Sequence, residues 1–221
     1  MENAVIYHFK IVMIGNIAEE KTKILKTYIG NDYDKDYSYK TNDSIIFTKN
    51  VNFEGKKVEL EIKDLIGQER YKNINKNDFT EKNGLMFIYN TAELNSFKFF
   101  ETQKSIILEN KNENLVNTLI AVKSNKEVIE NVSNENANKF AKELKMKFFE
   151  IDIDNKEQIN NIFNYILKEL IDKRNKEKSE TKINRLNLLN SIEDYNNSEE
   201  KSHGNKIKRN PNRHHSKKIH K

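Results

Sequence analysis

The sequence contains no cysteine among its 221 residues and only one proline, Pro211. Without cysteine there is no disulfide, no thiolate metal site and no attachment point for a prenyl or palmitoyl group near the C-terminus. Glu2 stands where N-myristoylation requires a glycine. We therefore expect a chain with no lipid anchor.

Long apolar runs are missing as well. No stretch approaches the roughly 20 apolar residues that cross a bilayer. The opening MENAVIYHFK lacks the apolar segment of a secretion signal. These absences predict a cytoplasmic protein.

The charge is unevenly distributed along the chain. Residues 1–171 hold 25 Lys and Arg against 27 Asp and Glu, a net charge of −2, whereas residues 172–221 hold 14 against 7, a net charge of +7. Residues 172–221 are so polar that they bury too little apolar surface to offset the entropy lost on ordering. We expect a folded domain over residues 1–171 and a basic, disordered tail over residues 172–221, with a short amphipathic turn near INRLNLLNSI as the one alternative.

Within residues 1–171, short apolar runs alternate with segments of helical periodicity, which predicts an α/β fold. Two alternating runs around Glu54-Gly55 predict a hairpin. The expected architecture is a six-stranded, mostly parallel sheet flanked by about five helices. Strands are expected at 7–14, 44–53, 57–65, 85–89, 118–122 and 148–151, and helices at 21–29, 96–109, 134–144 and 158–171.

The stretch GNIAEEKT follows the first expected strand and ends like a phosphate-binding loop, whose pattern is G-x-x-x-x-G-K-[ST]. Gly15, Lys21 and Thr22 fit that pattern, and Glu20 occupies the place of its last glycine. On this motif alone, a plain strand-to-helix turn with a capping threonine explains the residues equally well.

A second motif, Asp64-Leu65-Ile66-Gly67-Gln68-Glu69-Arg70, comes at the end of another expected strand. With it, the chain resembles the Ras-superfamily small GTPases, and most of all their Rab branch, over roughly residues 7–171. The stretches FKIVMIG, FEGKKVELEIKDLIGQERYKNI and GLMFIYNTAELNSF match the corresponding family segments in order and nearly in spacing.

The resemblance implies a site for GTP or GDP with Mg²⁺, in which the Gly15 loop surrounds the phosphates. Lys21 would contact the β and γ phosphates, Thr22 would bind the metal, and Asp64 would hold the metal through water. The amide of Gly67 would bind the γ phosphate, and Gln68 would orient the attacking water.

Thr41 falls where the family has the metal-binding threonine of its first switch. Its neighbours do not follow the family pattern, so an ordinary loop threonine is an equally good interpretation. The expected nucleotide-binding residues are Gly15, Lys21, Thr22, Gly67, Lys123 and Asn125. The expected metal ligands are Thr22, Thr41 and Asp64, and the expected catalytic residue is Gln68.

Three departures from the family weaken this expectation. Glu20 places a carboxylate beside the phosphates. Val122-Lys123-Ser124-Asn125 replaces the guanine-reading N-K-x-D and loses a charged hydrogen-bond acceptor. Asp152-Ile153-Asp154 replaces the family's S-A-K. Guanine recognition should therefore be weakened.

Two functions remain open at this point. The first is a divergent Rab-like GTPase, a nucleotide-dependent switch in vesicle traffic that would be a GTP hydrolase if active. The second is a pseudo-GTPase module that binds partners without turnover. Either would be a monomer that binds effector or regulatory proteins through its switch regions. The tail is either solvated without a specific partner or in loose contact with an acidic endomembrane surface, and nucleic acid is the least favoured partner.

Overall fold

The computed structural model describes residues 6–30, 38–40, 44–65, 74, 76–110, 112–123 and 131–204. Four of the expected site residues, Thr41, Gly67, Gln68 and Asn125, lie outside these ranges. Two compact units divide the chain, residues 1–173 and residues 174–221.

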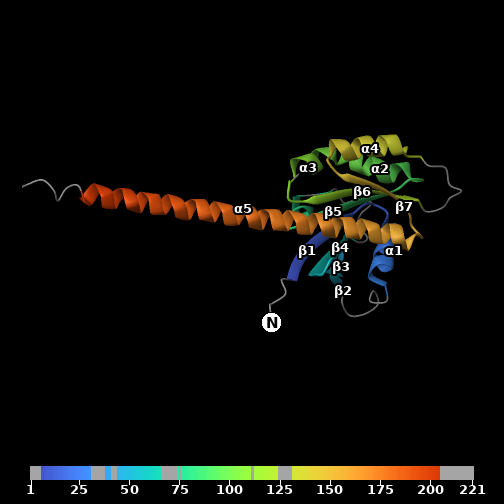
Figure 1. The fold of residues 1–221 in the computed structure, drawn as a ribbon. Helices are drawn as coiled ribbons and strands as arrows, with labels where there is room; N and C mark the ends of the chain where they lie inside the picture. Colours follow the sequence, from blue (N-terminus) through green and yellow to red (C-terminus); the bar gives the residue numbers. More distant parts are fainter. Residues whose placement is uncertain are drawn as a thin grey trace, which may run out of the picture. The chain divides into compact units, whose positions relative to one another are not determined.

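The first unit is built on one sheet with strand order β2-β3-β4-β1-β5-β6-β7 (Figure 1). The strands are β1 (Ile6–Ile14), β2 (Ser38–Lys40), β3 (Ser44–Phe53), β4 (Lys56–Leu65), β5 (Gly84–Asn90), β6 (Val116–Lys123) and β7 (Lys147–Asp152). Pairing is antiparallel in β2-β3-β4 and parallel across the rest of the sheet. The six expected strands and the hairpin are confirmed. β2 is an additional strand, too short at three residues to show a period in the sequence.

Five α-helices connect or follow these strands within the described residues: α1 (Ala18–Ile29), α2 (Leu94–Thr102), α3 (Lys104–Glu109), α4 (Asn134–Glu143) and α5 (Lys156–Gly204). A 3₁₀ turn, η2, covers Lys76–Asp78. The helix expected over 96–109 is interrupted at Gln103, which separates α2 from α3. None of the described helices is both long enough and apolar enough to cross a bilayer.

Each face of the sheet carries its own hydrophobic core. On one face, α1 and the first part of α5 cover the sheet. Their apolar side chains, among them Ile24, Leu25, Phe163 and Leu167, pack against side chains of β1 and β4 that include Phe9, Ile11 and Leu60. On the other face lie α2, α3 and α4 (Figure 1). Phe97, Phe100 and Phe140 of these helices pack there against Val12, Leu85 and Phe87. β5 is buried on both sides, which explains why its sequence is a continuous apolar run.

The region beyond residue 171 differs from the expected disordered tail, because α5 continues without a break to Gly204. Residues 172–203 contain neither proline nor glycine, so nothing in the backbone interrupts the helix. Arg174 pairs with Glu177 and Lys176 pairs with Glu180, each at 3.9 Å and at helical spacing. The structure therefore has a helix over residues 172–204, where the sequence predicts disorder. Residues 205–221 lie outside the described part of the chain.

Candidate functional site

Parallel pairing places β1 between β4 and β5, so that the carboxyl ends of all three strands meet at one edge of the sheet. The turn that leaves β1 there consists of Gly15, Asn16 and Ile17. A Cβ atom on Gly15 would lie 2.2 Å from the carbonyl oxygen of Ile88. Glycine is required at position 15 because the turn passes directly against the backbone of β5.

α1 begins immediately after this turn, at Ala18. The phosphate-loop pattern needs the positions up to 20 as a loop, but here residues 18–20 already form the first turn of the helix. The amide of Lys21 donates to the carbonyl of Ile17 at 3.2 Å and is therefore not open to an anion. Ile17 supplies no side-chain cap. The turn is shorter than a phosphate-wrapping loop.

Lys21 and Asp64, the two charged residues of the motifs, form an ion pair at this edge. The Lys21 Nζ lies 3.1 Å from Asp64 Oδ1, and the two side chains are 0% and 4% exposed. The same Nζ donates to the carbonyl of Leu65 at 2.8 Å. Thus the ammonium assigned to phosphate and the carboxylate assigned to metal neutralise each other.

Burial dominates the titration of Asp64. It raises the pKa of this carboxyl above its usual range, because burial disfavours the charged form. The positive charge of Lys21, and hydrogen bonds from Lys21 and Thr22, act in the opposite direction without cancelling the effect of burial. Lys21, Thr22 and Asp64 therefore form one interacting cluster.

Glu20 is held by a residue that the sequence motifs did not single out. Asn90, the last residue of β5, donates from Nδ2 to Glu20 Oε1 at 2.7 Å. Asn90 is itself fixed, since its Oδ1 accepts from the amide of Ala92 at 2.9 Å and its backbone amide donates to Ser96 Oγ at 3.0 Å. The carboxylate at the place of the last glycine is thus tied to the neighbouring strand end. The sequence did contain a signal for this contact. Asn90 is a polar residue at the end of the apolar run GLMFIYN, on the strand next to β1.

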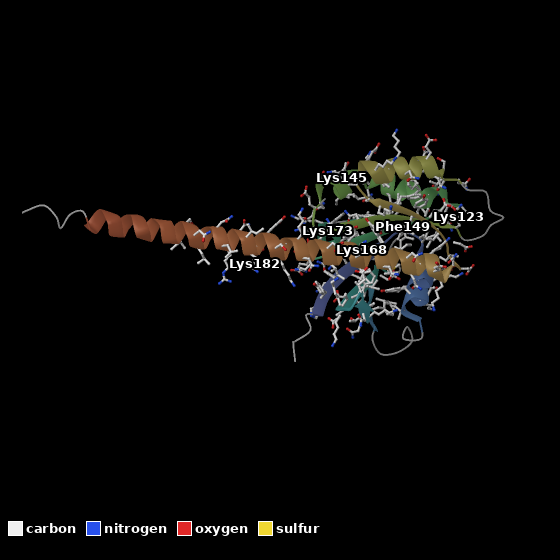
Figure 2. The ribbon with its side chains drawn as sticks, viewed as in Figure 1. Lys123, Lys145, Phe149, Lys168, Lys173 and Lys182 are labelled. Carbon is white, nitrogen blue, oxygen red and sulfur yellow. The ribbon has the colours of Figure 1, made fainter. Side chains whose placement is uncertain are left out.

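The ends of β6 and β7 carry the residues expected near a base. Lys123, which is labelled in Figure 2, pairs with Glu150 of β7 at 2.6 Å. After β7, the amide of Ile153 donates to the carbonyl of Lys123 at 3.1 Å. Asp154 pairs with Lys23 of α1 at 2.5 Å. These contacts join β6, β7 and α1 through charged side chains at the surface.

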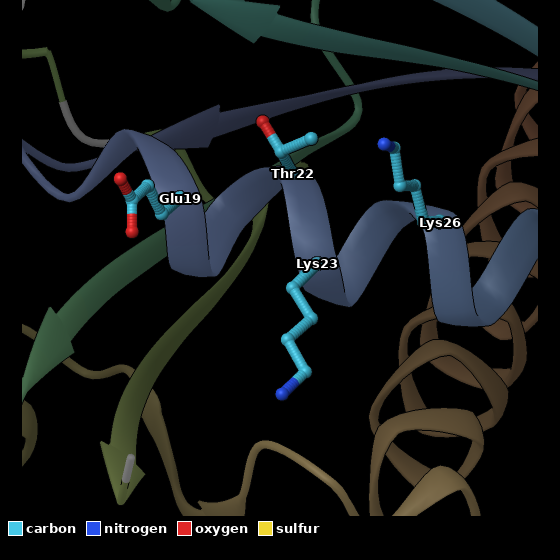
Figure 3. A pocket seen from close by; sticks show the side chains of 4 residues that line it. All are labelled: Glu19, Thr22, Lys23 and Lys26. Carbon is cyan, nitrogen blue, oxygen red and sulfur yellow. The ribbon is translucent and has the colours of Figure 1, made fainter.

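A shallow depression lies on the outer side of α1, lined by Glu19, Thr22, Lys23 and Lys26. Figure 3 shows Thr22 and Lys23 leaving the helix on different sides. Thr22 therefore contributes both to this depression and to the cluster with Asp64. In the part of the chain that the structure describes, no group of three or more His, Asp or Glu side chains could hold a metal.

The structure thus brings together Gly15, Lys21, Thr22 and Asp64, and places Lys123 at a separate strand end. As these side chains lie, they do not fit a diphosphate with Mg²⁺. The Lys21–Asp64 pair would have to separate, and the first turn of α1 would have to unwind to release the Lys21 amide. Glu150 and Asn90, the partners of Lys123 and Glu20, are the residues that the sequence motifs missed.

A sheet of this order, with a glycine turn leading into a Lys-Thr helix and an aspartate ending the adjacent strand, defines the class of P-loop-type α/β proteins that includes the small GTPases. A family model for the Ras family matches residues 10–172, and the chain belongs to that family. Among its relatives, Ras-related protein Rab-13 of Bos taurus is 26% identical over 172 residues, covering 77% of this chain and 84% of that protein. Ras-related protein Rab-11B of Dictyostelium discoideum is 30% identical over 164 residues, covering 72% and 74%. Ras-related protein RABA4b of Arabidopsis thaliana is 27% identical over 170 residues, covering 77% and 75%. The expected Rab-like membership is confirmed.

Proposed function

We propose that this Rab-like protein acts in intracellular traffic as a partner-binding module whose fold is complete without guanine nucleotide. The observation that carries the proposal is the fully buried Lys21, paired with Asp64 at 3.1 Å. A nucleotide and its metal would have to replace this pair, and separating a buried pair leaves each charge without compensation. Nucleotide binding would therefore lose the free energy that is needed to separate Lys21 from Asp64.

The base side of the site supports the same proposal. Lys123 is held by Glu150. Asp152 ends β7, and Asp154 lies in the turn after it. Asp154 brings a carboxylate, already paired with Lys23, to the position from which the family's S-A-K contacts the base. Recognition of guanine would have to come from other groups.

A second candidate, a weak nucleotide-dependent switch with GTP hydrolysis, is favoured by one observation. Lys21, Thr22 and Asp64 interact at one edge of the sheet, where the family uses these residue types for phosphate and Mg²⁺. In that case the ion pair would be the nucleotide-free arrangement, opened by ligand. The two candidates differ in whether any nucleotide binds.

Thermal unfolding of the purified full chain distinguishes them. With Mg²⁺ and GTP, GDP or ATP at millimolar concentration, the module should show no change in its thermal midpoint. A nucleotide present at about 100 times its Kd would add about 2.7 kcal/mol and raise the midpoint by about 5 to 10 °C. A rise of this size with GTP or GDP, absent with ATP, would refute the module and establish the switch.

A matched variant tests the role of the departures. Glu20→Gly combined with Asn125→Asp restores the family pattern at both positions. If Glu20 and Asn125 weaken binding, this variant should gain a Mg²⁺-dependent shift with GDP that the wild type lacks. The same Asn125→Asp change with Glu20→Gln serves as the control, because it keeps a side chain in the place of glycine.

Rescue in cells tests the traffic role itself. Cells that lack the protein should show a slowed vesicle transport step. The double variant Lys21→Met/Asp64→Leu removes the phosphate and metal groups together and should restore transport as well as the wild type does. Failure of a folded double variant would favour the nucleotide switch, and normal transport without the protein would refute the traffic role.

A further inference from the structure

The second part of α5, which belongs to the unit of residues 174–221, exposes a group of large aliphatic side chains. Five of them are between 48% and 61% exposed: Ile183, Leu186, Leu188, Leu189 and Ile192. Exposed aliphatic side chains gathered within ten residues mark an interaction surface more often than a solvated one. This surface, called here the aliphatic segment, needs a partner.

Leu186 and Leu189 are neighbours at the centre of the aliphatic segment, and Ile183 and Ile192 flank them on the two sides of the helix. Ile183, Leu186, Leu189 and Ile192 recur every third residue, and successive members of such a row are neighbours on a helix surface. The row extends over about 14 Å at 1.5 Å per residue. It is long enough to meet another helix over two to three turns.

The charges on the two sides of the aliphatic segment are opposite. Residues 174–185 hold five basic residues and two acidic ones, a net charge of +3. Residues 193–200 hold four acidic residues and no basic one, a net charge of −4. The helix therefore runs from positive through apolar to negative.

We propose that the second part of α5 pairs with the same segment of a second copy of this chain, with the two helices antiparallel. In that orientation the positive stretch of each copy faces the negative stretch of the other. A parallel pair would place like charges opposite each other along both stretches. The charge sequence selects one orientation.

The aliphatic row is self-complementary in the same orientation. Pairing centred between residues 187 and 188 sets position 183 opposite 192 and position 186 opposite 189. Lys182, seen on α5 in Figure 2, then stands opposite position 193, which is a glutamate. From this single choice of centre, Leu186 of one copy meets Leu189 of the other, and Lys182 meets Glu193.

A second copy fits better than an acidic membrane surface. A helix that lies on such a surface carries basic residues on its polar side along its length. Here the acidic stretch 193–200 follows the aliphatic segment directly and would be repelled by anionic lipid. The pairing is expected to be weak and reversible, because stable coiled coils need three to four heptads of apolar contacts. Under this proposal the chain would pass reversibly between the monomer expected from the sequence and a dimer.

Sedimentation equilibrium of the full chain tests the pairing. The wild type should pass from monomer to dimer as its concentration rises through the micromolar range. Leu186→Gln/Leu189→Gln should weaken the association by about tenfold or more, because each leucine loses its burial in the pair. Leu94→Gln/Leu108→Gln is the matched control, since these leucines are 40% and 43% exposed in the first unit and should leave the association unchanged.

Charge reversal tests the orientation. Lys182→Glu/Arg185→Glu and Glu193→Lys/Asp194→Lys should each weaken self-association, and an equimolar mixture of the two variants should associate at least as well as the wild type. Because the chain has no cysteine, single cysteines report directly. Leu189→Cys near the centre should form an intermolecular disulfide. Lys178→Cys should not, because antiparallel pairing separates its two copies by about 30 Å.

Three results would overturn the proposal. One is a wild-type chain that stays monomeric up to millimolar concentration. Another is disulfide formation by Lys178→Cys as fast as by Leu189→Cys, which would mean a parallel pair. The third is a monomer that binds vesicles of anionic lipid and loses that binding in Leu186→Gln/Leu189→Gln, which would make the membrane the partner of the aliphatic segment.

Discussion

The two ends of the candidate site hold their charges in opposite ways. At the ends of β1 and β4, Lys21 and Asp64 are almost completely buried. At the ends of β6 and β7, Lys123 and Glu150 are 36% and 29% exposed. Breaking a buried ion pair is costly because it leaves one charge buried without a partner, whereas an exposed pair contributes little to stability. Under the proposed function, the buried Lys21–Asp64 pair is part of the structural core of the fold, whereas the exposed Lys123–Glu150 pair contributes little to stability.

The largest effect is expected from separating the buried pair. Lys21→Met or Asp64→Asn should each lower the free energy of unfolding by about 3 to 5 kcal/mol, because the remaining partner is left buried without its counter-charge. Lys21→Met/Asp64→Leu should recover most of this loss. Urea unfolding of the three variants measures it. A double variant no more stable than the worse single one would contradict a structural pair.

The next effect concerns the turn that carries this end. Gly15→Ala should lower the free energy of unfolding by about 1 to 3 kcal/mol, since the new Cβ would meet the Ile88 carbonyl oxygen at 2.2 Å. Gly55→Ala is the control. Gly55 has a φ of 77° but nothing within 4 Å of an added Cβ, so it should lose only about 1 kcal/mol from backbone strain. Equal losses of unfolding free energy in Gly15→Ala and Gly55→Ala would mean that the turn at Gly15 can move away from the Ile88 carbonyl at little cost.

The bond between Glu20 and Asn90 should have a smaller effect. Asn90→Asp places a second carboxylate against Glu20 and should cost about 1.5 kcal/mol in unfolding free energy, as the charged hydrogen bond is lost. Adding Glu20→Gln should restore most of the loss by removing the repulsion. The double-mutant cycle gives the coupling between the two side chains, and a coupling near zero would show that Glu20 does not depend on Asn90.

The smallest effect is expected at the exposed end. Lys123→Ala or Glu150→Ala should change the free energy of unfolding by at most about 1 kcal/mol, and the difference should shrink in high salt. Chemical unfolding in low and high salt measures both. A loss comparable to that of Lys21→Met would remove the contrast between the two ends.

The sequence was sufficient for most of the sheet because all of its described strands except β2 have an apolar pattern of their own. The buried run of β5 and the alternating hairpin β3-β4 are local patterns, and the turn at Glu54-Gly55 marks where the chain reverses. The three residues of β2 carry no such pattern. For α5, composition suggested a disordered tail, but the absence of helix-breaking residues and the spaced ion pairs allowed the helix to continue.

The candidate site was only partly predictable, since motifs name residues but not their partners. The strand-end motifs identified Lys21, Thr22 and Asp64, which do meet. They could not reveal that Lys21 would pair with Asp64 itself, because the pairing depends on how α1 lies against the end of β4. Asn90 was missed for a similar reason: its role arises from its neighbour across the sheet and not from any motif of its own.

The pairing of Lys21 with Asp64 has a consequence for how the protein persists in a cell. Both members of the pair come from the same chain, so they are always present in equal amount and at fixed proximity. Under the proposed function, depletion of cellular energy stores would leave the unfolded fraction unchanged, whereas a relative stabilised by its bound cofactor would become more exposed to proteases as that cofactor ran out.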